Sequence, residues 1–251
     1  MLVVPKLKFT FDSPSLTINL LMPMPLRFFA GMVCFFFFSF TTVPSRVFSV
    51  QEVRSLYDQL TINSQELPHW DCFAYGMQGY LKLDNEGQIQ QPYLTLIDFS
   101  LPSTEKRLWV IDMRQYKVVE HTYVSHGMNS GLVQPTDFSN EEGSFKSSLG
   151  FYLTTSIYYG KHGLSLKLKG LEPGFNDLAE QRSIVMHGAT YVSKKHIQKF
   201  NRLGRSQGCP ALAQKEANRI IPMIKDQSCL FIYAPQKTYL EQSSFITEQS
   251  I

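Results

Sequence analysis

The stretch from residue 90 to residue 238 is a succession of short segments rich in β-branched and aromatic residues, bounded by polar turns. One of these segments alternates strictly between apolar and polar residues, which is typical of a half-buried strand. The predicted strands cover residues 93–98, 107–112, 116–124, 147–157, 164–168, 183–186 and 228–233. No repeat or long linker interrupts them, so the sequence predicts one mainly β domain.

Two segments have helical spacing instead. Apolar residues recur every three or four positions in residues 50–67, and again in the segment that follows Pro210 and runs to Ile224. The sequence therefore predicts an N-terminal helix and a few short helices within the β domain. The expected organisation is a leader at 1–49, a helical and connecting region at 50–89, a catalytic domain at 90–238 and a loose polar tail at 239–251.

The leader has the pattern of an export signal. Arg27 precedes the apolar run 28–40, whose 13 residues match a signal-peptide core and fall short of the roughly 20 that span a membrane. Val47 and Ser49 suit a cleavage site, which predicts a mature chain beginning near Val50. The alternative is an uncleaved leader that anchors the protein to the membrane. In both cases the remainder of the chain is expected outside the cytoplasm, in the periplasm or cell envelope.

The charge balance argues against nucleic-acid binding. The chain has 24 basic and 21 acidic residues, and the leader holds four of the basic residues and one of the acidic residues. The remainder therefore holds 20 of each and lacks the basic excess of a nucleic-acid binder.

The leader is long for a signal peptide, so Met22 and Met24 are alternative translation starts.

Cysteine usage leaves a disulfide open. Cys34 lies in the leader, and the odd number that follows allows a Cys72–Cys229 pair with Cys209 free. No C-x-x-C motif and no His/Cys cluster has zinc-ligand spacing, so the sequence predicts neither a metal nor a cofactor.

The sharpest local motif is the segment 204–210, G-R-S-Q-G-C-P. A helix expected just after Pro210 would place Cys209 at a helix N-terminus, which favours the nucleophilic thiolate. Gly208 gives the backbone freedom to turn its N–H groups toward a developing oxyanion. Taken alone, the motif favours a buried cysteine at the start of a helix over a nucleophile.

A nucleophilic cysteine needs a base, and three histidines precede glycine: His126, His162 and His187. Spacing cannot choose among them, because the partners meet in space rather than in sequence. His187 has the most favourable context, since it ends an apolar strand that would hold its ring rigidly.

Several separated motifs, in order, resemble one family. Met186-His187-Gly188 and Ser206-Gln207-Gly208-Cys209 resemble the H-G … S-x-G-C signature of YkuD-type L,D-transpeptidases, and the chain most resembles the murein L,D-transpeptidase catalytic domain branch. The resemblance spans about residues 90 to 235. It also includes the segments 124–127, 138–140, 143–144, 147–152, 160–163, 176–177, 188–189, 191–193 and 210–211.

The resemblance implies a β-sandwich-like fold with the cysteine and histidine on one face under a flap. It implies that Cys209 attacks the carbonyl at the L-centre of diaminopimelate in a stem tetrapeptide and releases D-alanine. An amine of a second stem, giving a 3→3 cross-link, or of a wall-anchored lipoprotein would then take the acyl group. Water as acceptor would make the protein a carboxypeptidase.

The resemblance also assigns site residues. His187 would be the base, oriented by the backbone carbonyl of Gly188. The backbone N–H groups of Gln207, Gly208 and Cys209 would form the oxyanion hole. The further substrate-binding candidates are Arg205, Ser206, His126, His162 and Tyr152.

One departure from the family concerns substrate recognition. Many members carry an arginine two residues after the cysteine, where this chain has Ala211. Arg205 is the natural substitute and Arg202 a weaker one, since an arginine fork suits a carboxylate.

Two other classes of function remain. A protein could keep this fold as an inactive peptidoglycan-binding module, or Cys209 could serve thiol redox chemistry, although no second cysteine lies near it in the sequence.

Overall fold

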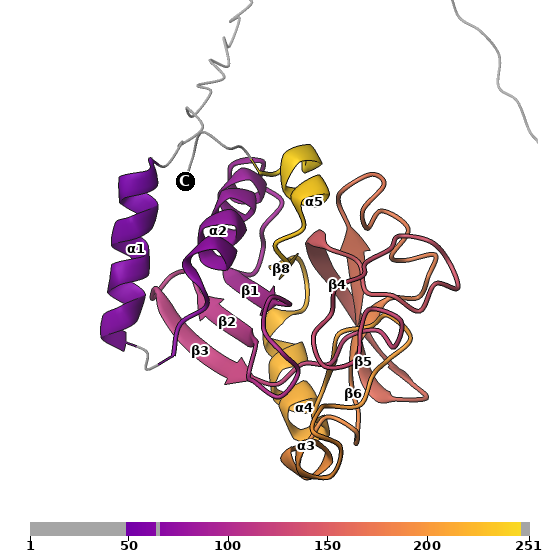
Figure 1. Cartoon of the computed structure of the whole chain (residues 1–251). Helices are drawn as coiled ribbons and strands as arrows, with labels where there is room; N and C mark the ends of the chain where they lie inside the picture. The colour runs from indigo at the N-terminus through magenta and orange to yellow at the C-terminus, as the bar shows by residue number, and fades with distance from the viewer. Residues whose placement is uncertain (1–48, 64–65, 247–251) are drawn as a thin grey trace, which may run out of the picture. The chain divides into compact units, whose positions relative to one another are not determined.

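The computed structural model describes residues 49–63 and 66–246, in which an eight-stranded sheet is the central element (Figure 1). The strands occur in the order β3-β2-β1-β8-β4-β5-β6-β7 across the sheet. Their bounds are β1 Tyr93–Asp98, β2 Leu108–Asp112, β3 Lys117–Thr122, β4 Gly150–Gly160, β5 Gly163–Gly170, β6 Val185–Gly188, β7 Ala211–Leu212 and β8 Cys229–Tyr233. The prediction of a mainly β domain is confirmed.

The sheet nearly closes on itself, in place of the two stacked sheets of a sandwich. Strand β8 pairs in parallel with β1 and antiparallel with β4, so one continuous ladder joins both halves. At the open edges, Ser125 just beyond β3 forms an antiparallel bridge with Ala211 of β7. The Ser125 N–H donates to the Ala211 carbonyl at 2.9 Å. The two edge strands are thus connected by a short seam.

Five helices surround the sheet (Figure 1). They are α1 Val50–Asn63, α2 Trp70–Asn85, α3 Lys194–Phe200, α4 Gln214–Ile224 and α5 Lys237–Gln242. Helix α2 packs on β1 and β8, and α1 packs on α2 and β3. Helix α2 was not predicted as an element, because glycines interrupt its pattern. Those glycines permit close packing: a Cβ on Gly76 would lie 2.4 Å from Leu96 Cδ2, and one on Gly79 would lie 2.0 Å from Phe151 Cε1.

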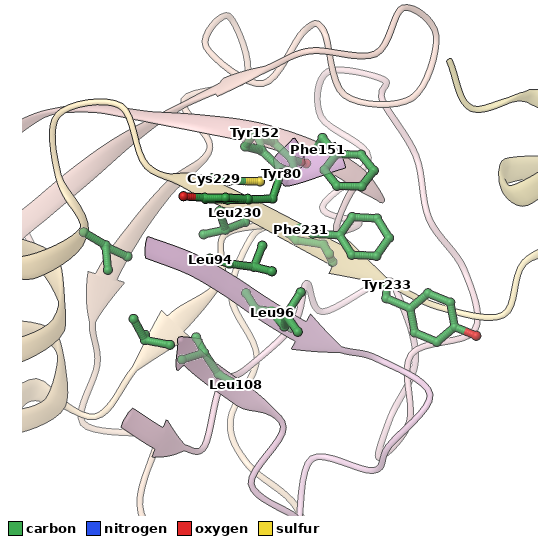
Figure 2. Close-up of a cluster of buried hydrophobic side chains, with 14 of the residues drawn as sticks. Tyr80, Leu94, Leu96, Leu108, Phe151, Tyr152, Cys229, Leu230, Phe231 and Tyr233 are labelled. Atoms are coloured by element: carbon green, nitrogen blue, oxygen red, sulfur yellow. The ribbon is translucent and has the colours of Figure 1, made fainter. Parts of the chain in front are cut away.

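The core lies where α2 meets the centre of the sheet (Figure 2). Phe151 of β4 stacks on Phe231 of β8 with ring centroids 4.2 Å apart. Leu94 and Leu96 of β1 are fully buried and lie in register with Cys229 and Phe231 of β8. Each fully buried leucine or phenylalanine contributes roughly 1.5–3 kcal/mol of transfer free energy. The strands that carry the site are therefore anchored to a rigid centre.

The helix expected directly after Pro210 starts later than predicted. Ala211 and Leu212 form β7, which pairs in parallel with β6, and α4 begins only at Gln214. The two residues are fully buried and are held by pairing on one side and by the Ser125 bridge on the other. Cys209 therefore precedes a strand, and no helix N-terminus acts on its thiol.

The segment after β8 also differs from the loose polar tail expected at 239–251. Tyr239 of α5 is fully buried and donates a hydrogen bond to Glu172 Oε2 at 2.9 Å, and Ser243 bonds Glu172 Oε1. Because Glu172 also accepts from the Phe151 N–H at 2.7 Å, this carboxylate ties α5 to the sheet. Residues 247–251 lie outside the described part.

The predictions for the leader and Cys34 fall on residues 1–48, outside the described residues. Within the described residues, no helix is both long and apolar enough to cross a membrane. Cys72 and Cys229 are both free and buried, so the proposed pair between them is wrong. Burial raises the pKa of both thiols, which makes them inert at neutral pH.

Candidate active site

The parallel pairing of β6 and β7 brings together two residues that are far apart in the sequence. His187 of β6 is in register with Ala211, which places Cys209 opposite Val185. The Val185 N–H donates to Cys209 Sγ at 3.4 Å, and the thiol donates to the Ser183 carbonyl at 3.7 Å. Alternate residues of a strand share a face, so Cys209 and His187 face the same pocket.

The nucleophile loop, residues 204–210, is held by hydrogen bonds of its own. The Ser206 hydroxyl donates to the Cys209 carbonyl at 2.6 Å and accepts from the Gly208 N–H at 3.1 Å. Ser206 therefore shapes the turn. This use of the Gly208 N–H removes it from the expected oxyanion hole. The Gln207 N–H donates to no backbone acceptor in the described part of the chain, and the Cys209 N–H contacts only its own thiol, so these two are the remaining candidates.

Glycine is required at Gly208 in this loop and at Gly127 in the segment that packs against it. Gly208 has φ of +121°, and a Cβ there would lie 2.9 Å from the Lys146 carbonyl oxygen. A Cβ on Gly127 would lie 2.5 Å from the Phe145 carbonyl oxygen and 3.0 Å from Gly208 Cα. Ser147 completes the contact by donating to the Gly208 carbonyl at 3.1 Å. The 126–127 and 147–148 motifs thus act by supporting the nucleophile loop.

His187 is held in one tautomer. Its Nδ1 lies 2.9 Å from the Gly188 carbonyl oxygen, which can only accept, so the proton resides on Nδ1 and Nε2 is free to accept. Its ring stacks on His162 with centroids 4.3 Å apart and planes at 22°. Burial lowers the pKa of His187, the Gly188 carbonyl opposes this, and His162 and Lys161 lower it further. The ring is therefore a neutral base near pH 7.

The Cys209 thiol is also neutral at rest. Burial raises its pKa, while the Val185 N–H and then the charges of Arg182 and Lys161 act in the opposite direction. No hydrogen bond joins Cys209 to His187 in the described residues. The resting pair is consequently a thiol and an imidazole, not a preformed ion pair.

Arg182 is a site residue that the sequence did not reveal. Its guanidinium donates to the carbonyls of Ser139 and Lys146, each at 2.7 Å, and to the hydroxyls of Ser148 and Ser144. All four acceptors are neutral, so the charge is uncompensated where it lines the pocket beside Cys209. In the sequence, the only indication of this role is that a basic residue stands just before the strand that carries His187.

Arginine 182 is expected to control the ionisation of Cys209. Because the thiol pKa is raised, the rate of alkylation by iodoacetamide should increase with pH through neutrality rather than level off near pH 6. In Arg182→Gln the profile should move to higher pH, with alkylation about tenfold slower at pH 7. Arg182→Lys retains the charge and should stay close to the wild type. If the pH profiles of alkylation had the same midpoint in the wild type and both variants, this role of Arg182 would be contradicted.

The pocket has a volume of about 700 Å³ and a positive lining. Lys161, Arg182 and Arg205 line it together with His162 and His187, and no acidic residue does. The tip of the β4–β5 hairpin, which carries Lys161 and His162 in its turn, forms one wall. The lining suits a ligand that bears carboxylates. No group of three metal-ligating side chains occurs within residues 49–63 and 66–246.

Three of the predicted substrate-binding residues line the pocket: Arg205, Ser206 and His162. Arg205 donates through Nη1 to the carbonyls of Met128 and Gly131 at 2.7 and 3.0 Å, which fixes it at the rim. Arg202 lies outside this pocket, in a neighbouring one.

His126 and Tyr152 are not part of the pocket lining. His126 is fully buried, with Nδ1 2.7 Å from Arg107 Nη2, and burial followed by the Arg107 charge lowers its pKa to about 3. Tyr152 is fully buried and donates to the Ser148 carbonyl at 3.1 Å. Both side chains pack in the interior, where they stabilise the loops that support the site.

Comparisons with known proteins converge on one family. A family model described as the L,D-transpeptidase catalytic domain matches residues 65–233. No curated protein sequence gives a significant match.

Solved structures with related folds include an L,D-transpeptidase from Mycobacterium smegmatis, 11% identical, with a TM-score of 0.36 over 57% of this chain and 59% of that one. An L,D-transpeptidase (Yku) from Stackebrandtia nassauensis is 12% identical, with a TM-score of 0.34 over 75% and 79%. Another, from Xylanimonas cellulosilytica, is 11% identical, with a TM-score of 0.32 over 75% and 94%. The match of the family model to residues 65–233 identifies the family.

Proposed function

Because this chain belongs to the L,D-transpeptidase catalytic domain family, we propose that it is a cysteine acyltransferase acting on peptidoglycan stem peptides. The observation that carries the proposal is the pocket shared by Cys209 and His187, with Nδ1 of the histidine 2.9 Å from the Gly188 carbonyl oxygen. That contact holds the proton on Nδ1 and leaves Nε2 able to accept the thiol proton.

The chemistry follows from the neutral resting pair. His187 Nε2 takes the thiol proton as Cys209 Sγ attacks the carbonyl at the L-centre of diaminopimelate. The N–H groups of Gln207 and Cys209 stabilise the oxyanion. Collapse of the tetrahedral intermediate passes the proton from His187 to the departing amine of D-alanine and leaves a thioester on Cys209. An acceptor amine then attacks the thioester, gives its proton to His187, and releases the new amide and the thiolate, which regains that proton.

Substrate carboxylates would be held by the cations of the pocket. Ala211, at the position where many family members carry arginine, is fully buried in β7 and leaves that role vacant. Arg205 at the rim takes it in this proposal, since only Nη1 of its fork is engaged by the protein. Arg182, whose donors are occupied, acts through its charge.

The substrate lies in the cell wall, so the proposal includes export to the periplasm or cell envelope. The acceptor is an amine of a second stem or of a wall-anchored lipoprotein. Membrane contact would occur only through an uncleaved leader.

The test is incubation of residues 50–251 with purified disaccharide-tetrapeptide, with products identified by mass spectrometry. We expect D-alanine release, a thioester on Cys209 and cross-linked dimers. Tripeptide without dimers would replace transpeptidation by carboxypeptidase activity. A folded protein that forms neither a thioester nor any product would overturn the proposal in favour of a binding module.

A further inference from the structure

One stretch of this chain is far more basic than the rest. Residues 181–215 contain seven lysines and arginines and no aspartate or glutamate, in a chain whose totals are 24 basic and 21 acidic residues. The proposed mechanism uses only Arg182 and Arg205 of these seven. The remaining charges therefore need a separate account.

Four of the unused charges lie on α3 and the turn that follows it, and are called the basic surface below: Lys194, Lys195, Lys199 and Arg202. The three lysines are exposed, and no ion pair engages any of the four in the described residues. Helix α3 has no buried residue, so its lysines are not by-products of core packing.

A second pocket of about 340 Å³ connects this basic surface to the catalytic pocket. Met128, Tyr191 and Arg205 line both pockets. On the α3 side the second pocket is lined by His196, Phe200 and Arg202, again without an acidic residue. A ligand lying across the shared wall would reach from the basic surface toward Cys209.

The second pocket also has an exposed aromatic residue. Phe200 is 48% exposed, its ring lies 4.5 Å from that of His196, and Lys199 Nζ lies 5.1 Å from its centroid. An exposed aromatic face can cover apolar groups of a ligand, while the neighbouring cations attract its carboxylates. Peptides with several acidic groups have this chemistry.

We propose that the basic surface and its pocket form a docking site for a polymer bearing carboxylates along a peptide backbone, and that this site retains the polymer beside the catalytic pocket. The inference rests on the proposed function, since the stem peptides of the cell wall bear carboxylates and are repeated along a polymer. The surface adds affinity through several weak contacts and takes no part in the chemistry at Cys209. Its contribution should fade with salt, because exposed charges are screened over about 8 Å at physiological ionic strength.

The test compares two triple variants of the whole 50–251 protein. Lys194→Gln/Lys195→Gln/Lys199→Gln removes three charges from the basic surface. Lys106→Gln/Lys117→Gln/Lys169→Gln removes three exposed charges elsewhere and is the matched control. Binding to poly-L-glutamate would be measured at low and physiological salt, with polyphosphate as a second probe. The α3 variant should lose about tenfold in affinity for polyglutamate at low salt, and the control should lose little.

Three results would overturn the docking site: equal binding by the α3 variant and the wild type, equal losses in both variants, or a loss seen with polyphosphate alone, which would indicate a phosphate polymer. Acylation of Cys209 by the small tetrapeptide donor should be unchanged in both variants. If the wild type binds polyglutamate through α3 but never forms a thioester, the proposed function fails while the docking site stands.

Discussion

Replacement of Cys209 by alanine is expected to abolish release of D-alanine from the tetrapeptide, with a loss of at least about 10⁴-fold. The reaction needs a nucleophile that forms a covalent bond, and Cys209 is the one cysteine among the described residues that lines the pocket. Ser165 and Ser206 also line it, but their hydroxyls donate to the carbonyls of Gly163 and Cys209. Mass spectrometry of intact protein should show that the thioester is absent.

A matched control comes from the other described cysteines. Cys72→Ala/Cys229→Ala removes two fully buried thiols whose pKa values burial raises, so it should reduce stability while retaining the thioester on Cys209. Turnover that persists in Cys209→Ala, or disappears only in the control, would show that the nucleophile has been misassigned.

Replacement of His187 by alanine is expected to slow D-alanine release by about 10²- to 10⁴-fold at pH 7. The thiol is un-ionised at this pH because burial raises its pKa, so attack requires a base that removes the proton. In strongly alkaline buffer hydroxide replaces that base, and iodoacetamide should alkylate Cys209 of the variant as fast as that of the wild type. The alkylation profile thus separates loss of the base from loss of the fold.

His162→Ala is the control for the ring stack. His162 is exposed at the hairpin turn and contacts His187 only through its face, 4.3 Å between centroids. It should change the rate less than tenfold, since His187 keeps its bond to the Gly188 carbonyl. An equal loss in His162→Ala and His187→Ala would contradict the assignment of His187 as the base.

The sequence predicted the strands well where they are buried on both faces. The segment 93–98 was predicted with its observed bounds, because five of its six residues are buried and no helical period competes with the β-formers. Ala211–Leu212 was assigned to the following helix instead. Two apolar residues are too few to show a period of their own, and only pairing with distant residues makes them a strand.

The Cys209–His187 pair was predicted from the motif and the resemblance to a family, and both residues line one pocket. The sequence motif could not reveal that Arg182 lines the pocket, or that the Gly208 N–H is bonded to Ser206 and so is not free for the oxyanion hole. Both depend on which oxygen lies near a donor in three dimensions: the Lys146 carbonyl for Arg182, and the Ser206 hydroxyl for Gly208. His126 shows the converse, since its motif context resembled a binding site while its ring is buried against Arg107.

The seam between Ser125 and Ala211 bears on which parts of the protein can tolerate changes in sequence. The long strands β4 and β5 pair over most of their length and β8 carries stacked aromatic rings, whereas the seam is a single bridge. Cys209 lies just before β7, the two-residue strand at this seam, where few hydrogen bonds oppose local opening. We therefore expect substitutions and loop insertions around the seam to be tolerated and to change which acceptor reaches Cys209. The paired strands β4, β5 and β8 would continue to stabilise the fold.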